Sequence, residues 1–444
     1  FCSALSLSLA LASVVTGTPA QAKVDPSVMR SAIDTQVMRD WPELEALYKD
    51  LHSHPETAFR ETRTAGVLAA RLKAMGVEVT EGVGKTGLVG IIRNGAGPTV
   101  LIRTELDALP MEEKTGLPYA SRAQQTNADG KTSFVDHACG HDIHMAWWIG
   151  TAKALLAMKG RWHGTVILVG QPAEEVVSGA KAMLDDGLYT RFPKPDFAFS
   201  AHIGPSPAGE VTIKQGFTTS ASDAVNVTFH GQGAHGSMPD KSIDPVVMGA
   251  RFVSDVQTVI SRQKDPMKFG VITVGAFHAG TAANIIPDTA ELGLTLRSYD
   301  PAVRETLLKG VKTTADAVAM MSGAPAPDVV HSHGTGSVNN EPALSAQAAT
   351  MLTMALGKNR VILIPASEPG WTASEDFSEY AEGGKGRSVY FSIGGTSPEV
   401  AARLKAEGKP VPVNHSPFFA PDPEVSIKTG VETLTLATLM VAGK

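Results

Sequence analysis

The chain has 444 residues, of which 43% are hydrophobic and 19% charged, and its formal net charge is −6. This composition is typical of a soluble globular protein, and the length predicts more than one domain. Because acidic residues outnumber basic ones, we expect no basic surface that would bind a phosphate backbone, and therefore no nucleic-acid partner.

The first 22 residues differ in composition from the rest. An apolar run at residues 5–15 precedes Thr-Pro-Ala-Gln-Ala at residues 18–22, which is typical of a secretory signal peptide and its cleavage site. The run is shorter than the ~20 apolar residues that span a membrane. We therefore predict that residues 1–22 are a signal peptide, that no membrane span remains, and that the protein is periplasmic or secreted.

Loss of that segment would leave Cys139 as the single cysteine, because Cys2 lies within it. One thiol cannot form an internal disulfide, and in an oxidising compartment it needs burial or a ligand for protection. The histidines at positions 137 and 141 favour metal binding over burial alone.

Hydrophobic periodicity predicts two helices within residues 37–75, interrupted at residues 52–56, and strands at 88–93 and 99–103. Further along, we expect a helix at 138–159 and buried strands at 165–170 and 197–201. Segments rich in Asp, Glu and His follow three of these strands. Because ligands collect beyond the carboxyl ends of strands in α/β sheets, we predict an α/β fold with a mixed, mostly parallel sheet flanked by helices.

A second pattern begins near residue 218. It contains expected strands at 224–230, 271–276 and 289–298 and expected helices at 244–262 and 301–321, and prolines at 325 and 327 mark its end. The first pattern then returns, with a strand at 388–393. We therefore predict a discontinuous catalytic domain, residues 23–217 and 329–444, with an α+β sandwich domain, residues 218–328, inserted into it.

Several residues in the first pattern suit metal-dependent hydrolysis. Glu174 and Glu175 are adjacent after a strand, so one carboxylate can bind an ion while the other transfers a proton. Cys139 and His141 can reach a common point, and the start of a helix favours the thiolate form of the cysteine. Asp142 is placed to orient a ligating imidazole.

Two more histidines extend this set. His202 follows a strand, and His415 lies in an Asn-His-Ser-Pro segment near the C-terminus. Together with the thiol, the imidazole of His141 and one glutamate, they give about the number of ligands that a two-ion site requires. Such ligands accommodate Zn, Mn, Co or Ni, so the sequence leaves the metal open. His144 is expected to be an ordinary core histidine.

The chain contains, in order, Leu106-Asp-Ala-Leu-Pro110, His137-Ala-Cys-Gly-His-Asp142, Gln171-Pro-Ala-Glu-Glu175, Gly233-Ala-His-Gly-Ser-Met-Pro239, Ala283-Asn-Ile-Ile-Pro287, Ser374-Glu-Asp-Phe377 and Asn414-His-Ser-Pro417. This set resembles the M20 metallopeptidase family, and within it the amidohydrolases of the hippurate hydrolase and auxin-conjugate hydrolase type. The resemblance runs from about residue 40 to the end of the chain.

The resemblance implies a two-metal site in the larger domain and hydrolysis of the amide bond of an N-acyl amino acid. By position, Cys139 matches the ligand that bridges both ions and Glu174 matches the general base and acid. The other ligand positions of the family are matched by His141, Glu175, His202 and His415.

The resemblance also implies that the inserted domain is a lid or dimerisation domain and that the protein is a homodimer. His235 matches a residue that stabilises the oxyanion, often across the dimer interface. Asn284 and Arg297 match substrate-binding positions, and a guanidinium suits an α-carboxylate. Asp107 matches a supporting acid near the metals.

One position departs from the branch, which usually has aspartate where this chain has Glu105. The longer side chain would change the geometry or metal preference of the site if it touched the ions. Three alternatives stay open: a dipeptidase or carboxypeptidase of the same family, a hydrolase with Cys139 as nucleophile, and a non-catalytic periplasmic binding protein. The last two leave the glutamate pair unexplained.

Overall fold

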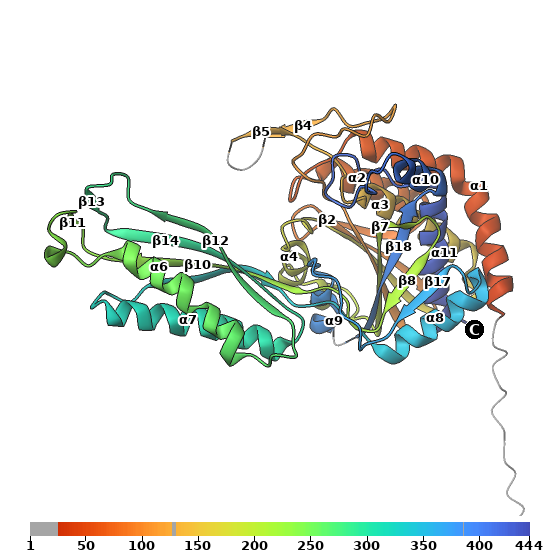
Figure 1. The fold of residues 1–444 in the computed structure, drawn as a ribbon. Coiled ribbons are helices and arrows are strands. Elements are labelled where there is room, and N and C mark those ends of the chain that lie inside the picture. Colours follow the sequence, from red (N-terminus) through yellow and green to blue (C-terminus); the bar gives the residue numbers. More distant parts are fainter. Residues whose placement is uncertain (1–24, 127–129, 385) are drawn as a thin grey trace, which may run out of the picture.

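The computed structural model describes residues 25–126, 130–384 and 386–444. Figure 1 shows two lobes, a larger one that contains the helices near both ends of the chain and an elongated smaller one. The expected signal peptide, residues 1–22, lies outside the described residues.

The larger lobe is built on a mixed sheet. Within the described residues, eight strands form it in the order β1-β2-β6-β3-β7-β18-β8-β17. β3 is parallel to both β6 and β7, β7 to β18 and β8 to β17, whereas the remaining neighbours are antiparallel. The strands are β1 (Glu78–Val83), β2 (Gly87–Asn94), β3 (Thr99–Glu105), β6 (Gly164–Gln171), β7 (Phe197–Pro207), β8 (Val211–Lys214), β17 (Val361–Ile364) and β18 (Arg387–Thr396). The predicted α/β fold with a mixed, mostly parallel sheet is confirmed.

Helices cover both faces of this sheet, which explains why its central strands are apolar throughout. In β6, Val166 and Leu168 belong to one core, whereas Ile167 and Val169 belong to the other. The first face is covered by α1 (Pro26–Ser53), α2 (Thr62–Ala74), α3 (His141–Ala157), α8 (Pro342–Leu356) and α11 (Pro423–Ala442). The second is covered by α4 (Gly179–Asp185), α5 (Leu188–Arg191) and α9 (Ser378–Gly384).

Helix α1 begins at Pro26, earlier than the predicted start at residue 37. Asp25 caps it by accepting a hydrogen bond from the Ser27 amide at 2.8 Å. Ile33 and Met29 are buried about one and two turns before Val37, so they extend the buried face of the helix toward its N-terminus. The predicted interruption near Pro55 is present, because α1 ends at Ser53 and α2 follows at Thr62.

Helix α11 is long and apolar enough to cross a membrane by length and composition. However, 78% of its most apolar stretch is buried inside the protein, where it packs against α1, α3 and the sheet. We therefore interpret it as the central core helix of the larger lobe.

The smaller lobe has its own core between one sheet and two helices. Within the described residues, four strands form this sheet in the order β12-β14-β10-β15. It extends to Thr335, beyond the predicted end at residue 328, because the last strand pairs with β10. The elements are β10 (Ala221–His230), α6 (Pro245–Asp255), β12 (Gly270–Ala279), β14 (Thr289–Ser298), α7 (Pro301–Met321) and β15 (Asp328–Thr335).

Short elements complete the two lobes. They are β4 (Gln124–Thr126), β5 (Thr132–Phe134), β9 (Gly216–Phe217), β11 (Ala234–His235), β13 (Ile285–Ile286), β16 (Asn339–Asn340) and α10 (Pro398–Ala406). β9 and β16 pair with each other where the chain passes between the lobes. β11 and β13 pair at the far tip of the smaller lobe (Figure 1).

Candidate metal centre and active-site cavity

The predicted metal ligands converge at one edge of the larger sheet. β3 lies between β6 and β7 and runs parallel to both, so the carboxyl ends of these strands share that edge. The contributing residues are Cys139 before α3, His141 at its start, Glu174 and Glu175 after β6, His202 in β7 and His415 before α11.

A tight turn at Gly140 brings Cys139 and His141 to the same side. Gly140 has a φ of +84°, a left-handed conformation that favours glycine. A Cβ at this position would also overlap the Cγ2 of Ile203 on β7. Glycine therefore lets the start of α3 approach β7 closely enough for its ligands to meet His202.

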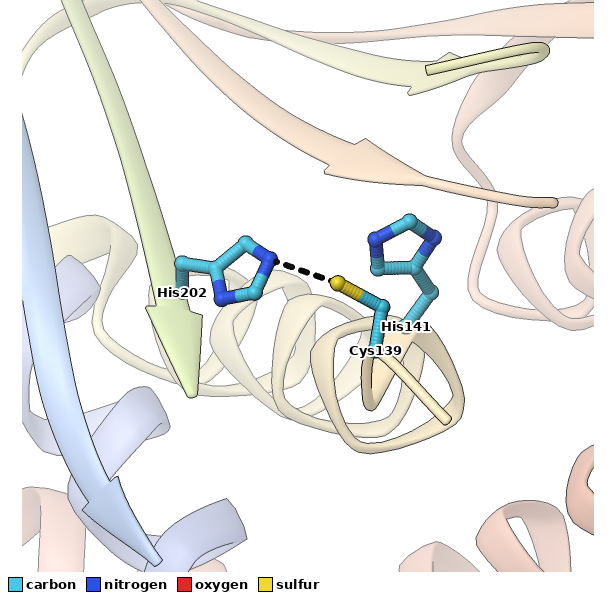
Figure 2. A group of neighbouring side chains, drawn as sticks. All are labelled: Cys139, His141 and His202. Carbon is cyan, nitrogen blue, oxygen red and sulfur yellow. Dashed lines mark hydrogen bonds between the residues drawn. The ribbon is translucent and has the colours of Figure 1, made fainter. Parts of the chain in front are cut away.

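Two groups of side chains share the cysteine. Figure 2 shows His202 directed at Cys139, and its Nε2 lies 3.4 Å from the sulfur. One ligand atom each of Cys139, His141 and His202 lies within 4.8 Å of the other two. The same holds for Cys139, Glu175 and His415. A sulfur common to two groups is the arrangement that a thiolate bridging two ions needs.

Backbone carbonyls orient both imidazoles in the first group. His141 Nδ1 donates a hydrogen bond to the Asp107 carbonyl at 2.7 Å, and His202 Nδ1 donates to the Ile203 carbonyl at 2.7 Å. In each ring this directs the Nε2 atom toward the cysteine. Fixing one ring nitrogen through the other is the usual support for a metal-binding histidine.

Asp107 also positions the glutamate pair. Its carboxylate accepts hydrogen bonds from the amides of Glu174 and Glu175 at 3.1 and 3.0 Å. His141 Nε2 and Glu175 Oε1 are buried 3.9 Å apart, and among the described residues neither has a hydrogen-bond partner. Two buried ligand atoms that face each other without such partners fit a bound cation, because buried polar atoms otherwise find one.

Asp142 does not contact any of the predicted metal ligands through its side chain. Its carboxylate instead accepts a hydrogen bond from His52 Nδ1 at 2.6 Å. Adjacent residues on a helix point in different directions, so His141 and Asp142 serve opposite sides of the start of α3.

The predicted thiolate-favouring effect of the helix start is also overridden. Burial, together with the charges of Glu175 and Glu174, holds the pKa of the Cys139 thiol well above its usual range. Burial lowers the pKa of His141, but the hydrogen bond to Asp107 and nearby carboxylates outweigh it and raise the pKa to about 10. The carboxylates of the site thus favour protonated or cationic groups. Cys139 can become a thiolate there only if bound cations compensate its negative charge.

The sequence did not predict a buried network of charged side chains that lies behind Glu174. Burial and the charge of Glu375 hold the pKa of Glu174 well above its usual range. Arg103 offsets this charge by binding Glu375 at 2.7 Å, Asp376 at 3.1 Å and Gln171 at 2.9 Å. The available signals were an arginine within an apolar strand and the Ser-Glu-Asp-Phe motif, to which we assigned no role.

Glu105, the departure from the family pattern, belongs to the same network. Its carboxylate pairs with Arg103 and accepts a hydrogen bond from His144 Nδ1 at 2.9 Å. Burial raises its pKa, but Arg103 and His144 outweigh this effect and hold the pKa well below its usual range. Its contacts therefore lie behind the ligands, and His144 is the core histidine that we expected.

These residues open into a cavity of about 680 Å³ between the lobes. Ser222 and Arg297 reach it from the smaller lobe, where the guanidinium donates a hydrogen bond to the serine hydroxyl. Trp371 and Val177 provide apolar wall. The ligands and acids that line it are Cys139, Glu174, Glu175, His202, Glu375 and His415.

Two predicted site residues lie elsewhere. His235 and Asn284 are exposed at the β11–β13 tip of the smaller lobe, far from the larger lobe in Figure 1. His235 Nδ1 lies 2.7 Å from the Ser237 hydroxyl. Within one chain, the structure therefore does not bring these two residues to the cavity.

Residues 101–419 match the sequence profile of peptidase family M20/M25/M40. The chain belongs to this family. It is 32% identical over 416 residues to thermostable carboxypeptidase 1 of Saccharolobus solfataricus, covering 93% of this chain and 98% of that protein. It is 37% identical over 265 residues to hippurate hydrolase of Campylobacter jejuni, covering 59% and 66%.

The fold matches a solved structure of a dinuclear metal-binding M20 peptidase from Bacillus subtilis. The TM-score is 0.70 at 26% identity, and the match covers 92% of this chain and 99% of the other. This member of the M20 family is therefore a metal-dependent hydrolase that acts on amide or peptide bonds.

Proposed function

We propose that this M20 hydrolase releases amino acids from N-acyl amino acids with the help of two divalent ions. One observation carries the proposal. A single cavity is lined by Cys139, which two ligand groups share, by the buried carboxylate of Glu174 and by Arg297. A metal centre, a proton-transfer group and a carboxylate-binding group thus face the same space.

The ions would be held by Cys139, His141, Glu175, His202 and His415. When bound, they supply a lower pKa for the attacking water and polarise the scissile carbonyl. The mixed sulfur, nitrogen and oxygen ligands accept Zn, Mn, Co or Ni. The raised pKa of Cys139 argues against the alternative in which this thiol is the nucleophile, because the thiolate is the reactive form.

Glu174 is suited to move the proton. Its carboxylate lines the cavity, and burial with the nearby charge of Glu375 raises its pKa, which makes it a stronger base than an exposed glutamate. It takes a proton from the attacking water on one carboxylate oxygen. It then returns that proton to the amide nitrogen, so that the amine leaves as a neutral group.

Arg297 and Ser222 are placed to bind the carboxylate of the amino-acid part. A guanidinium offers two parallel N–H donors to a carboxylate, and burial lowers the pKa of Arg297 without bringing it near neutrality. Trp371 lies in the same cavity and is 39% exposed. Its indole provides an apolar surface for an aromatic or aliphatic acyl group.

The proposal also includes a homodimer and export from the cytoplasm. Because His235 and Asn284 lie at the tip of the smaller lobe, we propose that a homodimer delivers them to the partner's cavity. There His235 would stabilise the oxyanion.

We also propose that the protein is exported to the periplasm or secreted, because the sequence of residues 1–22 is typical of a signal peptide.

The decisive experiment measures amino-acid release from N-benzoyl and N-acetyl amino acids and from dipeptides. The enzyme is stripped with a chelator and assayed with and without added Zn, Mn, Co or Ni. We expect ion-dependent release from the acylated substrates and none from the Glu174→Gln variant reloaded with the same ion.

Other outcomes would assign the enzyme differently. Release from dipeptides alone would move it to the peptidases, as the carboxypeptidase relative suggests. Inhibition by thiol alkylation but not by chelation would favour the cysteine nucleophile. Tight binding of the panel without release under any ion would favour a binding protein.

A further inference from the structure

A second cluster of metal-binding residue types lies outside the cavity. It consists of His52 at the end of α1, Glu113 in the loop after β3, and Asp136 and Asp142 on either side of the loop that carries Cys139. Its members are buried, with 5%, 3%, 2% and 2% of their surfaces exposed in that order. The proposed function uses none of them as ligand or catalyst.

The His52 ring is aimed into this cluster. Its Nδ1 lies 2.6 Å from Asp142 Oδ2, which fixes the orientation of the ring. Its Nε2 lies 3.2 Å from Glu113 Oε2, yet among the described residues this nitrogen has no partner with hydrogen-bond geometry. One ligand atom each of His52, Glu113 and Asp136 lies within 4.8 Å of the other two.

These distances suit ligands around one ion. With metal–ligand bonds of about 2.0–2.4 Å, two ligands of the same ion are separated by about 3–4.8 Å. Glu113 is held in place by hydrogen bonds from the Thr115 hydroxyl and the Ser121 amide. The contact between His52 Nδ1 and Asp142 is the carboxylate–histidine support found behind many metal-binding imidazoles.

The charges in the cluster also favour a cation. Three carboxylates surround one imidazole, and burial together with the charge of Glu113 raises the pKa of Asp136 to about 7. The alternative is an ion pair in which protonated His52 bridges Asp142 and Glu113. Burial lowers the pKa of His52, but its contacts with these two carboxylates outweigh burial and raise the pKa to about 10. Its second N–H would then point at Glu113, whereas the contact lacks hydrogen-bond geometry.

We propose that His52, Glu113 and Asp136 bind a structural divalent transition-metal ion, separate from the ions of the cavity. The imidazole suits Zn²⁺, and the carboxylates also accommodate Mn²⁺. The ion joins the end of α1 and the loop after β3 to the segment that leads into Cys139 and His141. It thereby stabilises the turn from which two of the proposed catalytic-metal ligands project.

The test counts ions in the full-length protein after equilibrium dialysis against ZnCl₂ and, separately, MnCl₂. We expect about three ions per wild-type chain and about two in the Asp136→Asn and Glu113→Gln variants. Asp223→Asn is the matched control, since Asp223 is equally buried and bonded to His331 at 2.8 Å but lies in the smaller lobe. It should retain the wild-type count.

Cys139→Ser separates this site from the catalytic one, because it should lose ions from the cavity and keep the ion at His52. An unchanged ion count in Asp136→Asn relative to wild type would overturn the proposal and leave the ion-pair interpretation. If a variant does not fold, anomalous diffraction at the zinc edge from crystals of the wild-type protein provides a second test that needs no variant. A peak between His52 and Glu113 supports the site, and peaks confined to the cavity refute it.

Discussion

Replacing Gly140 with alanine tests whether close approach of α3 and β7 builds the metal centre. Two costs follow from the structure. The φ of +84° costs a non-glycine residue about 1–2 kcal/mol. The new methyl group would overlap the Cγ2 of Ile203, and overpacking of this kind costs about 1–3 kcal/mol. The free energy of unfolding should therefore fall by about 2–5 kcal/mol.

Gly76→Ala provides the matched control. Gly76 has a similar φ of +77°, but no described heavy atom outside its neighbours lies within 4 Å of a Cβ built there. Its alanine variant should lose only the conformational part, about 1–2 kcal/mol. The difference between the two variants therefore isolates the contact with Ile203.

The assay is urea denaturation of metal-stripped protein, combined with the ion content of the reloaded protein. Gly140→Ala should be less stable than Gly76→Ala by about 1–3 kcal/mol and should bind fewer ions. Displacement of the turn moves Cys139 and His141 away from His202, which explains the lost ions. Equal stability of the two variants with full ion content in both would refute this reasoning.

Three further predictions concern catalysis and pH. Glu174→Gln should keep its ions but lose ~10²–10⁴-fold in kcat, because the proton-transfer group is gone. Arg297→Lys should raise KM for N-acyl amino acids about 10-fold, because the two-pronged contact with the carboxylate is lost while the charge stays. Burial and the charge of Asp107 raise the pKa of Glu61 to about 7, so the folded protein holds this proton more tightly than the unfolded chain. Stability should therefore decline from pH 4.5 to pH 7, and Glu61→Gln should flatten that decline.

Each of these has a result that would contradict it. Near-normal turnover of Glu174→Gln would remove Glu174 from proton transfer. An equal rise in KM for N-acyl amines that lack a carboxylate would show that Arg297 does not bind that group. An unchanged slope of unfolding free energy against pH in Glu61→Gln would assign the pH dependence to other carboxyl groups.

The sequence predicted the catalytic lobe well where each feature had a local signal. Strand β6 is a continuous apolar run that ends in Gln-Pro-Ala-Glu-Glu, and β7 delivers His202 in the same way. Periodicity identifies such strands, and their order predicts that the following loops meet at one edge. The same logic placed Cys139 and His141 at the start of a helix.

Predictions that depended on neighbours in space fared worse. Asp142 was expected to orient an imidazole of the predicted ligand set, but the fold places His52, ninety positions earlier in the chain, against it. The pKa of Cys139 is governed by burial and by the carboxylates of the turn after β6 rather than by its own helix. The start of α1 and the strand β15 were also missed, since both are stabilised by packing partners far along the chain.

The sequence by itself determined the family, the α/β fold and the residue types available for metal-dependent hydrolysis, because motifs and hydrophobic periods are properties of short segments. The tertiary structure alone decided which side chains share an ion and which support them. It placed Arg103 and Glu375 behind Glu174, Arg297 in the cavity and His235 away from it. These outcomes depend on distances between segments far apart in the chain, and folding sets those distances by packing the two cores of the larger lobe and the core of the smaller lobe.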